Sequence, residues 1–256
     1  FITVPTPITK NNNPDLRTLI QATKLVSRNL KKNSIIVYES TVFPGCTEEI
    51  CNPIIEKISK FKLNKDFYLA YSPERINPGK SKYKLKNTVK VLGASNKTTL
   101  TKLNKIYKKI CLKTHLTENI KIAEAAKIIE NTQRDLNIAL INELSIIFKK
   151  MNIDTNKILE AAETKWNFIK FKPGLVGGHC IGVDPYYLTY KSKKLNYNPK
   201  VILSGRKIND GMGIYVAKKL ISLLKERKKI LKKTKLLFLG VAFKEVTEEL
   251  AKSVKL

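Results

Sequence analysis

Short apolar runs alternate with amphipathic segments along the first 115 residues, and this alternation restricts the possible folds more than any other feature of the sequence. The runs are rich in β-branched and aromatic residues, which favour strands. The segments between them place apolar residues at the spacing of a helix that buries one face. Strands are expected at residues 1–4, 35–38, 67–71 and 88–92, and helices at about 16–30 and 50–58. Strands that alternate with helices are typical of parallel βα units, so the sequence predicts half of a doubly wound α/β domain.

Residues 117–150 contain neither Gly nor Pro, and their apolar residues recur at helical spacing. This pattern predicts one long helix. At 1.5 Å per residue, ~30 residues span ~45 Å, which is more than a small domain needs. We therefore expect the helix to link two domains or to form the seam of a dimer.

The rest of the sequence is less regular. Asp154 is placed to cap a shorter helix that ends near residue 163, whereas the glycines and prolines of residues 166–190 predict a loop. A helix is expected at about 213–225, and residues 235–240 read as a strand and a turn that open a second α/β domain. The predicted domains are 1–115, a central helical domain at 116–212, and the start of the second α/β domain at 213–256.

The composition narrows the class of partner. The formal net charge is +28, and a strongly positive field attracts polyanions. Only six of the 49 basic residues are arginines, and lysine lacks the planar fork that reads bases and phosphates in a bidentate way. We therefore expect small molecules that carry phosphate, and no nucleic acid. No apolar run approaches the ~18–20 residues of a membrane span, so no membrane partner is expected.

The spacing of the cysteines bears on cellular location and on metal binding. The four of them lack the dense, even spacing of a secreted disulfide scaffold, and no secretory leader is present, so a cytoplasmic location is predicted. Cys46 and Cys51 have no second Cys/His pair that would complete a zinc site. No metal is expected.

Two groups of polar residues are candidates for chemistry. Cys180 lies among glycines, with Asp184 four residues further on, and a partly accessible thiol in such a segment is a candidate nucleophile. A packed structural thiol is the alternative. Lys127 and Asn131 are four residues apart on the long helix, so both could donate to a single oxyanion. A solvated polar stripe is the alternative there.

Four further candidate residues follow predicted strands, at the carboxyl edge where open α/β sheets bind ligands. Glu74 and Thr41 each come directly after a strand, and Pro5 and Thr6 occupy the same position after the first strand. The alternatives are an ordinary turn carboxylate for Glu74 and a hydroxyl that bonds its own loop for Thr41.

Five motifs, in order along the chain, resemble those of the UDP-sugar 6-dehydrogenases, the family that includes UDP-glucose and GDP-mannose dehydrogenases. They are VPTP at 4–7, YESTVFPG at 38–45, SPERINPG at 72–79, IENTQRD at 129–135 and GGHCIGVDP at 177–185. Two further segments, TKWNF at 164–168 and SGRKINDG at 204–211, are most similar to the branch that acts on UDP-N-acetylhexosamines.

The resemblance implies a partial Rossmann-type sheet and an NAD-dependent, four-electron oxidation of a sugar C6 alcohol to the uronate, for surface-polysaccharide synthesis. Cys180 would add to the intermediate aldehyde and would then form a thioester that water hydrolyses. Lys127 and Asn131 would stabilise the oxyanions, and Asp184 would assist proton transfer.

The same resemblance implies the remaining roles. Glu74, with Thr41, would orient or activate the hydrolytic water. Pro5, Thr6 and Thr41 would contact NAD. The UDP-sugar would be bound by Glu74, Arg75, Asn77, Lys127, Asn131, Phe171, Gly174, Gly177, Arg206 and Lys244. For Arg206, one more surface cation is the alternative. A homodimer through the long helix is expected.

Some parts of the family pattern fall outside the 256 residues. The Gly-x-Gly-x-x-Gly loop that binds the NAD pyrophosphate and most of the UDP-binding C-terminal domain are not in the sequence, so we expect truncation at both ends. Ala251 stands where the family has an arginine near the cofactor. A piece of a longer protein and a truncated gene product both explain these departures. The alternative functions are a UDP-glucose or GDP-mannose 6-dehydrogenase, an inactive dimeric scaffold, and a nucleic-acid binder.

Overall fold

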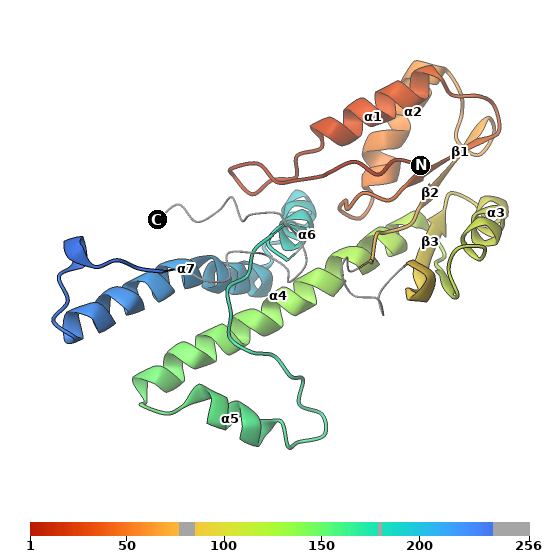
Figure 1. Cartoon of the computed structure of the whole chain (residues 1–256). Helices are drawn as coiled ribbons and strands as arrows, with labels where there is room; N and C mark the ends of the chain where they lie inside the picture. The colour runs from red at the N-terminus through yellow and green to blue at the C-terminus, as the bar shows by residue number, and fades with distance from the viewer. Residues whose placement is uncertain (77–84, 179–180, 238–256) are drawn as a thin grey trace. The chain divides into compact units, whose positions relative to one another are not determined.

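The computed structural model describes residues 1–76, 85–178 and 181–237, and the chain divides into two compact units (Figure 1). Unit 1 comprises Phe1–Asn131 and Val183–Asn198. Unit 2 comprises Thr132–Gly182 and Pro199–Leu256. The long helix α4 (Ile120–Lys150) contributes residues to both units.

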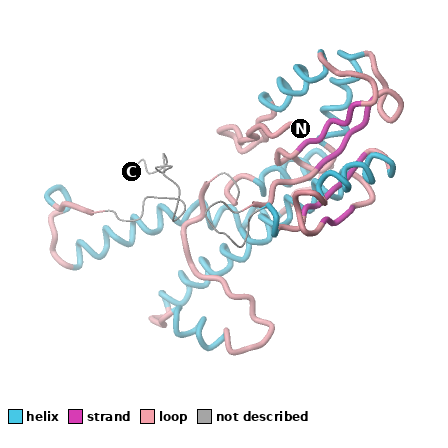
Figure 2. The backbone as a smooth tube through the Cα atoms, turned by 45° about the vertical axis from the view of Figure 1, so that its right-hand side comes forward, coloured by secondary structure: helices cyan, strands magenta, loops and turns pink. Residues whose placement is uncertain are grey.

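Unit 1 contains a four-stranded sheet in the order β1-β2-β3-β4, drawn in magenta in Figure 2. The strands are β1 (Ser34–Tyr38), β2 (Phe67–Tyr71), β3 (Lys90–Ala94) and β4 (Thr114–Leu116). Pairs β1–β2 and β3–β4 are parallel, as the alternation of elements predicts. Ile2 adds an isolated parallel bridge to Tyr38. The α/β fold class is therefore confirmed.

One strand pair departs from the expected parallel sheet, because β2 and β3 are antiparallel. A parallel pair needs a crossover connection, usually a helix, that returns the chain to the same edge. Within the described part of the connection between β2 and β3, only a short 3-10 turn (Leu85–Asn87) is regular. An antiparallel pair needs no such crossover, and β3 runs back alongside β2.

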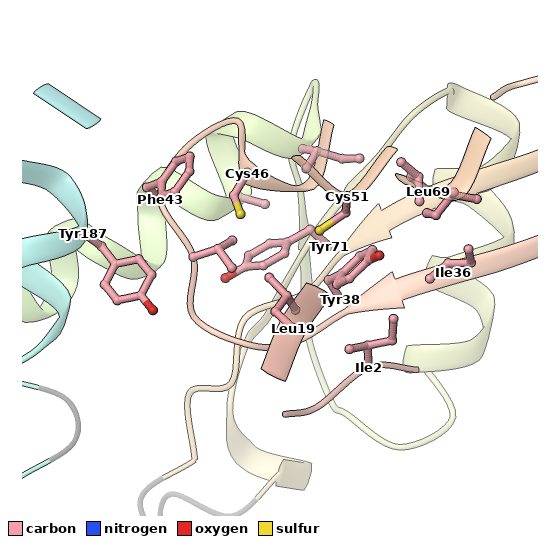
Figure 3. Close-up of a cluster of buried hydrophobic side chains, with 14 of the residues drawn as sticks. Ile2, Leu19, Ile36, Tyr38, Phe43, Cys46, Cys51, Leu69, Tyr71 and Tyr187 are labelled. Atoms are coloured by element: carbon pink, nitrogen blue, oxygen red, sulfur yellow. The ribbon is translucent and has the colours of Figure 1, made fainter. Parts of the chain in front are cut away.

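Helices cover both faces of this sheet. On one face, α1 (Arg17–Arg28) and α2 (Asn52–Ser59) contribute Leu19 and Ile55 to a core that includes Tyr38 and Tyr71 (Figure 3). On the other face, α3 (Lys97–Tyr107) contributes Leu103 and Tyr107 to a second core that includes Val37, Ala70 and Leu92. Successive strand residues point to opposite faces, so each strand supplies both cores.

Asparagine and aspartate side chains cap the N-termini of three helices. The Asn96 side chain accepts a hydrogen bond from Thr99 N at the start of α3, and Asn119 Oδ1 accepts one from Ile122 N at the start of α4. Asp154 accepts one from Asn156 N and caps α5 (Thr155–Ala162), as predicted. The prediction of one long helix is confirmed by α4.

Two helices correct the expectations for the second half of the chain. Residues 184–190, predicted to be loop, belong to α6 (Asp184–Lys194), because Pro185 occupies the first turn, where a missing N–H costs nothing. Helix α7 (Lys200–Glu226) begins well before residue 213. Gly205 lies within this helix, and a larger residue at this position would place its Cβ 2.4 Å from Leu136 Cδ2 of α4. The glycine permits close packing of the two helices within unit 2.

The expected second α/β domain lies mostly outside the described residues. Residues 235–237 form no strand, and 238–256 are not described. Among the helices of the described ranges, none is both long and apolar enough to cross a membrane.

The close packing of β3 against the start of α4 gives a testable prediction. A Cβ at Gly93 would come 2.7 Å from Asn119 O and 3.0 Å from Ile120 Cα, which are backbone atoms at the start of α4. We expect Gly93→Ala to lower the free energy of unfolding by about 1–3 kcal/mol, because backbone cannot move aside cheaply. Urea denaturation followed by circular dichroism measures the change. The control is Gly213→Ala in α7, where a Cβ meets no atom within 4 Å and a gain of about 0.5–1 kcal/mol is expected. Equal effects of the two substitutions would contradict the packing described here.

Candidate functional site

One face of α4 carries the polar groups that the sequence singles out. Lys127 and Asn131 lie one turn apart, and Asn131 Nδ2 donates a hydrogen bond of 2.5 Å to Oδ2 of Asp184, the first residue of α6. Asn131 and Asp184 are both buried, whereas Lys127 is half-buried. The structure thus brings three of the predicted catalytic residues together in unit 1.

Burial changes the acidity of the Asp184 carboxyl. Desolvation raises its pKa to about 6, against the hydrogen bond from Asn131 and the positive charge of Lys127, which both lower it. A carboxyl group with a pKa of about 6 exchanges its proton readily near neutral pH. This property suits the role in proton transfer that the resemblance of the motifs implies for Asp184.

A second buried carboxylate lies on the same face of α4, one turn before Lys127. Glu124 accepts hydrogen bonds from Gly45 N (2.5 Å) and Thr47 N (2.9 Å), at the start of a π-helical turn (Thr47–Cys51) that continues as α2. Desolvation raises its pKa to about 7 even though these hydrogen bonds lower it. Glu124 therefore connects α4 to the loop that carries Thr41.

The loop after β2 is also connected to α4. Arg75 forms a bidentate ion pair with Glu130, with distances of 2.7 Å from Nη2 to Oε1 and 3.3 Å from Nε to Oε2. Its Nη1 donates to Val89 O. Glu74 is exposed, and its Oε1 accepts from Ile76 N. The Glu74 carboxylate, which is predicted to orient or activate the hydrolytic water, is therefore accessible, and its neighbour Arg75 is bound to α4.

The proposed cofactor residues meet at the carboxyl end of β1. Thr6 Oγ1 donates to Thr41 O (2.7 Å), and Tyr187 of α6 donates to Thr6 O (2.9 Å). Pro5 is exposed, and Thr6 and Thr41 are half-buried. An accessible loop pair at this edge is where open α/β sheets bind nucleotides, so the residues present fit the part of an NAD site that they would form.

The predicted substrate residues of unit 2 are divided between surface and interior. Gly174 and Gly177 are exposed and Phe171 is half-buried. All three lie in the irregular segment that follows α5 in unit 2. Arg206 is buried, and its Nη1 donates to Asp135 Oδ1 at 2.6 Å. The simple surface cation considered for Arg206 is therefore wrong. Asn77, Cys180 and Lys244 lie outside the described residues.

Sequence reasoning missed Glu124 and Glu130. Glu124 lies three residues before Lys127 and seven before Asn131, so helical spacing alone places it on the same face. Glu130 is part of the IENTQRD motif, but only the fold shows that its partner is Arg75. Across residues 1–76, 85–178 and 181–237, no group of three His, Cys, Asp or Glu side chains is placed to bind a metal ion.

The raised pKa values predict how stability depends on pH. In the unfolded chain Glu124 and Asp184 lose their protons near their ordinary pKa values of 4.5 and 3.8, whereas in the folded chain they keep them until about pH 7 and 6. The stability that these protons contribute is complete below pH ~4 and is lost as the pH rises through 6 and 7. We expect Glu124→Gln to reduce the fall in unfolding free energy between pH 5 and 8 by on the order of 2 kcal/mol.

Urea titrations at several pH values measure this effect. Asp184 titrates in the same window, so part of the fall should persist in Glu124→Gln. Glu49→Gln is the control, because the hydrogen bond from Lys191 lowers the pKa of Glu49 and places its titration below the window. A Glu124→Gln profile parallel to that of the unsubstituted chain would show that this carboxyl does not titrate there.

Comparison with known proteins gives the site its context. Residues 1–111 match the NAD binding domain of the UDP-glucose/GDP-mannose dehydrogenase family, and residues 121–211 match its central domain. The chain is 51% identical over 246 residues to a UDP-N-acetyl-D-glucosamine 6-dehydrogenase of Pseudomonas aeruginosa and 53% identical over 246 residues to one of Salmonella typhi. Each of these alignments covers 96% of this chain and 58% of the relative.

The fold agrees with these matches. The structure of a UDP-D-ManNAc dehydrogenase from Pyrococcus horikoshii superposes with a TM-score of 0.82 at 30% identity, covering 89% of this chain and 54% of that one. The chain thus spans little more than half the length of the relatives that it matches. Matches to both family domains, together with these identities, show that the chain belongs to the UDP-glucose/GDP-mannose dehydrogenase family.

Proposed function

We propose that the protein oxidises the C6 alcohol of a UDP-N-acetylhexosamine to the carboxylate with two NAD⁺. The observation that carries this proposal is the buried Asn131–Asp184 hydrogen bond beside Lys127, on one face of α4. These residues combine a proton acceptor near neutral pH with a cation and an amide donor. An alcohol oxidation that passes through oxyanions needs such a set.

NAD⁺, which Pro5, Thr6 and Thr41 would contact, would supply the hydride acceptor for both oxidations at C6, and the residues of the chain manage the protons and the oxyanions. Asp184 accepts a proton released by the C6 hydroxyl, directly or through water. Lys127 and Asn131 donate to the oxygen that becomes negative. The Cys180 thiol adds to the aldehyde, and the second oxidation of this adduct gives a thioester.

Hydrolysis of the thioester releases the acid and regenerates the thiol. Glu74, with Thr41, orients or activates the water, and the exposure of Glu74 supports this role. The net change consumes one water and two NAD⁺ and gives the carboxylate, two NADH and three protons. Arg75 and Asn77, the backbone at Phe171, Gly174 and Gly177, and Arg206 and Lys244 bind the UDP-sugar.

The N-acetylated substrate is proposed because relatives above 50% identity are UDP-N-acetyl-D-glucosamine 6-dehydrogenases. We further propose that residues 1–115 bind NAD, that 116–212 form the central domain, and that 213–256 begin a UDP-binding domain. The uronate would serve surface-polysaccharide synthesis in the cytoplasm, with no nucleic acid or membrane partner.

An activity assay tests this function. The full-length protein should release NADH with UDP-N-acetylglucosamine or UDP-N-acetylgalactosamine, at two NADH per sugar, and much less with UDP-glucose or GDP-mannose. Cys180→Ala should abolish formation of the acid, because no thioester can form. Absorbance at the NADH band and chromatography of the sugar product measure both results.

Cys111→Ala is the control for loss of a thiol, since Cys111 is buried in the core on the α3 face of the sheet. It should retain acid formation. Unchanged uronate production by Cys180→Ala would remove Cys180 as the nucleophile. No NADH release with any of the nucleotide sugars would overturn the proposed function.

A homodimer is also proposed, with a second copy of the chain covering part of α4. The helix exposes four large apolar side chains: Ile122, Ile129, Leu140 and Ile147. Exposed apolar surface on a long helix is typical of a subunit contact. Sedimentation velocity should show a dimer, and Leu140→Lys should shift it toward monomer. A monomeric unsubstituted protein would contradict the proposed dimer.

A further inference from the structure

Asn142, in the C-terminal third of α4, binds both the N–H and the C=O of a single loop residue. Its Oδ1 accepts a hydrogen bond from Gly174 N (2.8 Å), and its Nδ2 donates to Gly174 O (3.0 Å). The Asn142 side chain is fully buried, whereas Gly174 is exposed. A carboxamide in this geometry takes the place of a neighbouring strand, because it satisfies the N–H and the C=O of the same residue.

The loop has little else to fix its main chain. Residues 169–178 contain no helix or strand, and none of them forms a backbone–backbone hydrogen bond with another described residue. A segment without such bonds adopts many conformations unless side chains restrict it. The two hydrogen bonds from Asn142 therefore set the path of the backbone around Gly174.

A chain of buried polar groups in turn orients the Asn142 side chain. Asn142 Nδ2 also donates to Asn209 Oδ1 (2.8 Å), and Asn209 Nδ2 donates to two oxygens of Asp135, the side-chain Oδ1 (2.7 Å) and the main-chain O (2.9 Å). Arg206 completes the series through its 2.6 Å bond to Asp135. All four side chains are almost fully buried. Each of the two amides has a single satisfactory orientation, because a reversed amide would place two donors or two acceptors against each other.

We propose that Asn142 is a positioning residue for the sugar nucleotide, and that the series Arg206–Asp135–Asn209–Asn142 fixes the loop backbone at Gly174 in the conformation that binds it. The inference rests on the proposed function, in which the backbone around Phe171 and Gly174 contacts the UDP-sugar. Asn142 does not itself touch the substrate. Its effect is to remove the entropy of ordering the loop from the cost of binding.

Kinetics of the full-length protein test the inference. In Asn142→Ala, KM for UDP-N-acetylglucosamine should rise about tenfold, whereas kcat and KM for NAD⁺ should change less than about twofold, since the loss concerns binding of one substrate. Hydrogen exchange at the Gly174 amide should accelerate, while exchange in the rest of α4 remains as in the unsubstituted protein.

Asn137→Ala is the matched control on the same helix. Among the described residues, the Asn137 side chain donates to Gln133 O of its own helix and to no part of the loop, so its removal should leave KM and the Gly174 exchange unchanged. Asn209→Ser is the second variant, and it serves if Asn142→Ala does not fold. It leaves the Gly174 contacts in place but removes the group that orients them, so a smaller rise in KM is expected.

Separate outcomes decide the two claims. An active unsubstituted protein whose Asn142→Ala and Asn209→Ser variants keep the same KM for the UDP-sugar would overturn the inference alone. A fall in kcat with both KM values unchanged would also overturn it, because that pattern indicates loss of folded protein. An unsubstituted protein that oxidises no UDP-sugar would overturn the proposed function, and the inference with it.

Discussion

The buried polar face of α4 is the feature on which the candidate site depends. Within unit 1, residues 124–131 of the helix contact three other segments: Glu124 binds the start of the turn after β1, the half-buried Glu130 binds Arg75 after β2, and Asn131 binds Asp184 of α6. Each contact joins residues that are far apart in the sequence. Because α4 is a single rigid element through this region, the three contacts set the positions of the loop residues relative to Lys127.

Burial of a carboxylate has a thermodynamic cost, because the charged form loses its hydration, and the raised pKa values of Glu124 and Asp184 express this cost. Glu124 is bound by two backbone N–H groups at the beginning of a helical segment, where the positive end of the peptide dipoles offsets part of this cost. For Asp184, the hydrogen bond from the Asn131 amide and the positive charge of Lys127 offset part of the cost of burial. Buried carboxyl groups with raised pKa values are common at functional sites, and Glu124 and Asp184 both lie beside the residues of the proposed reaction.

The local pattern of the sequence predicted most of the elements near the site. The apolar runs at β1 and β2, the long helix α4 and the cap at Asp154 all follow from short-range rules of periodicity and hydrogen bonding. Helix α6 was missed because Pro185 suggests a loop until the first turn of a helix is recognised around it. Helix α7 was predicted too short, because Gly205 is explained only by its approach to Leu136. The antiparallel pairing of β3 depends on the path of the chain between strands, which no local rule supplies.

The family, the motifs and the candidate residues follow from residue type and spacing, because these carry the chemistry of a carboxylate, an amide or a thiol. Helical periodicity in the sequence also places Lys127 and Asn131 on one face. The hydrogen bonds and ion pair that join Asn131 to Asp184, Glu130 to Arg75, and Asn142 to Gly174 are visible only in the folded chain. These partners are 32 to 55 residues apart along the chain. Contacts of this kind arise from the packing of whole elements, and the environment that raises the pKa of Asp184 exists only once that packing has excluded water.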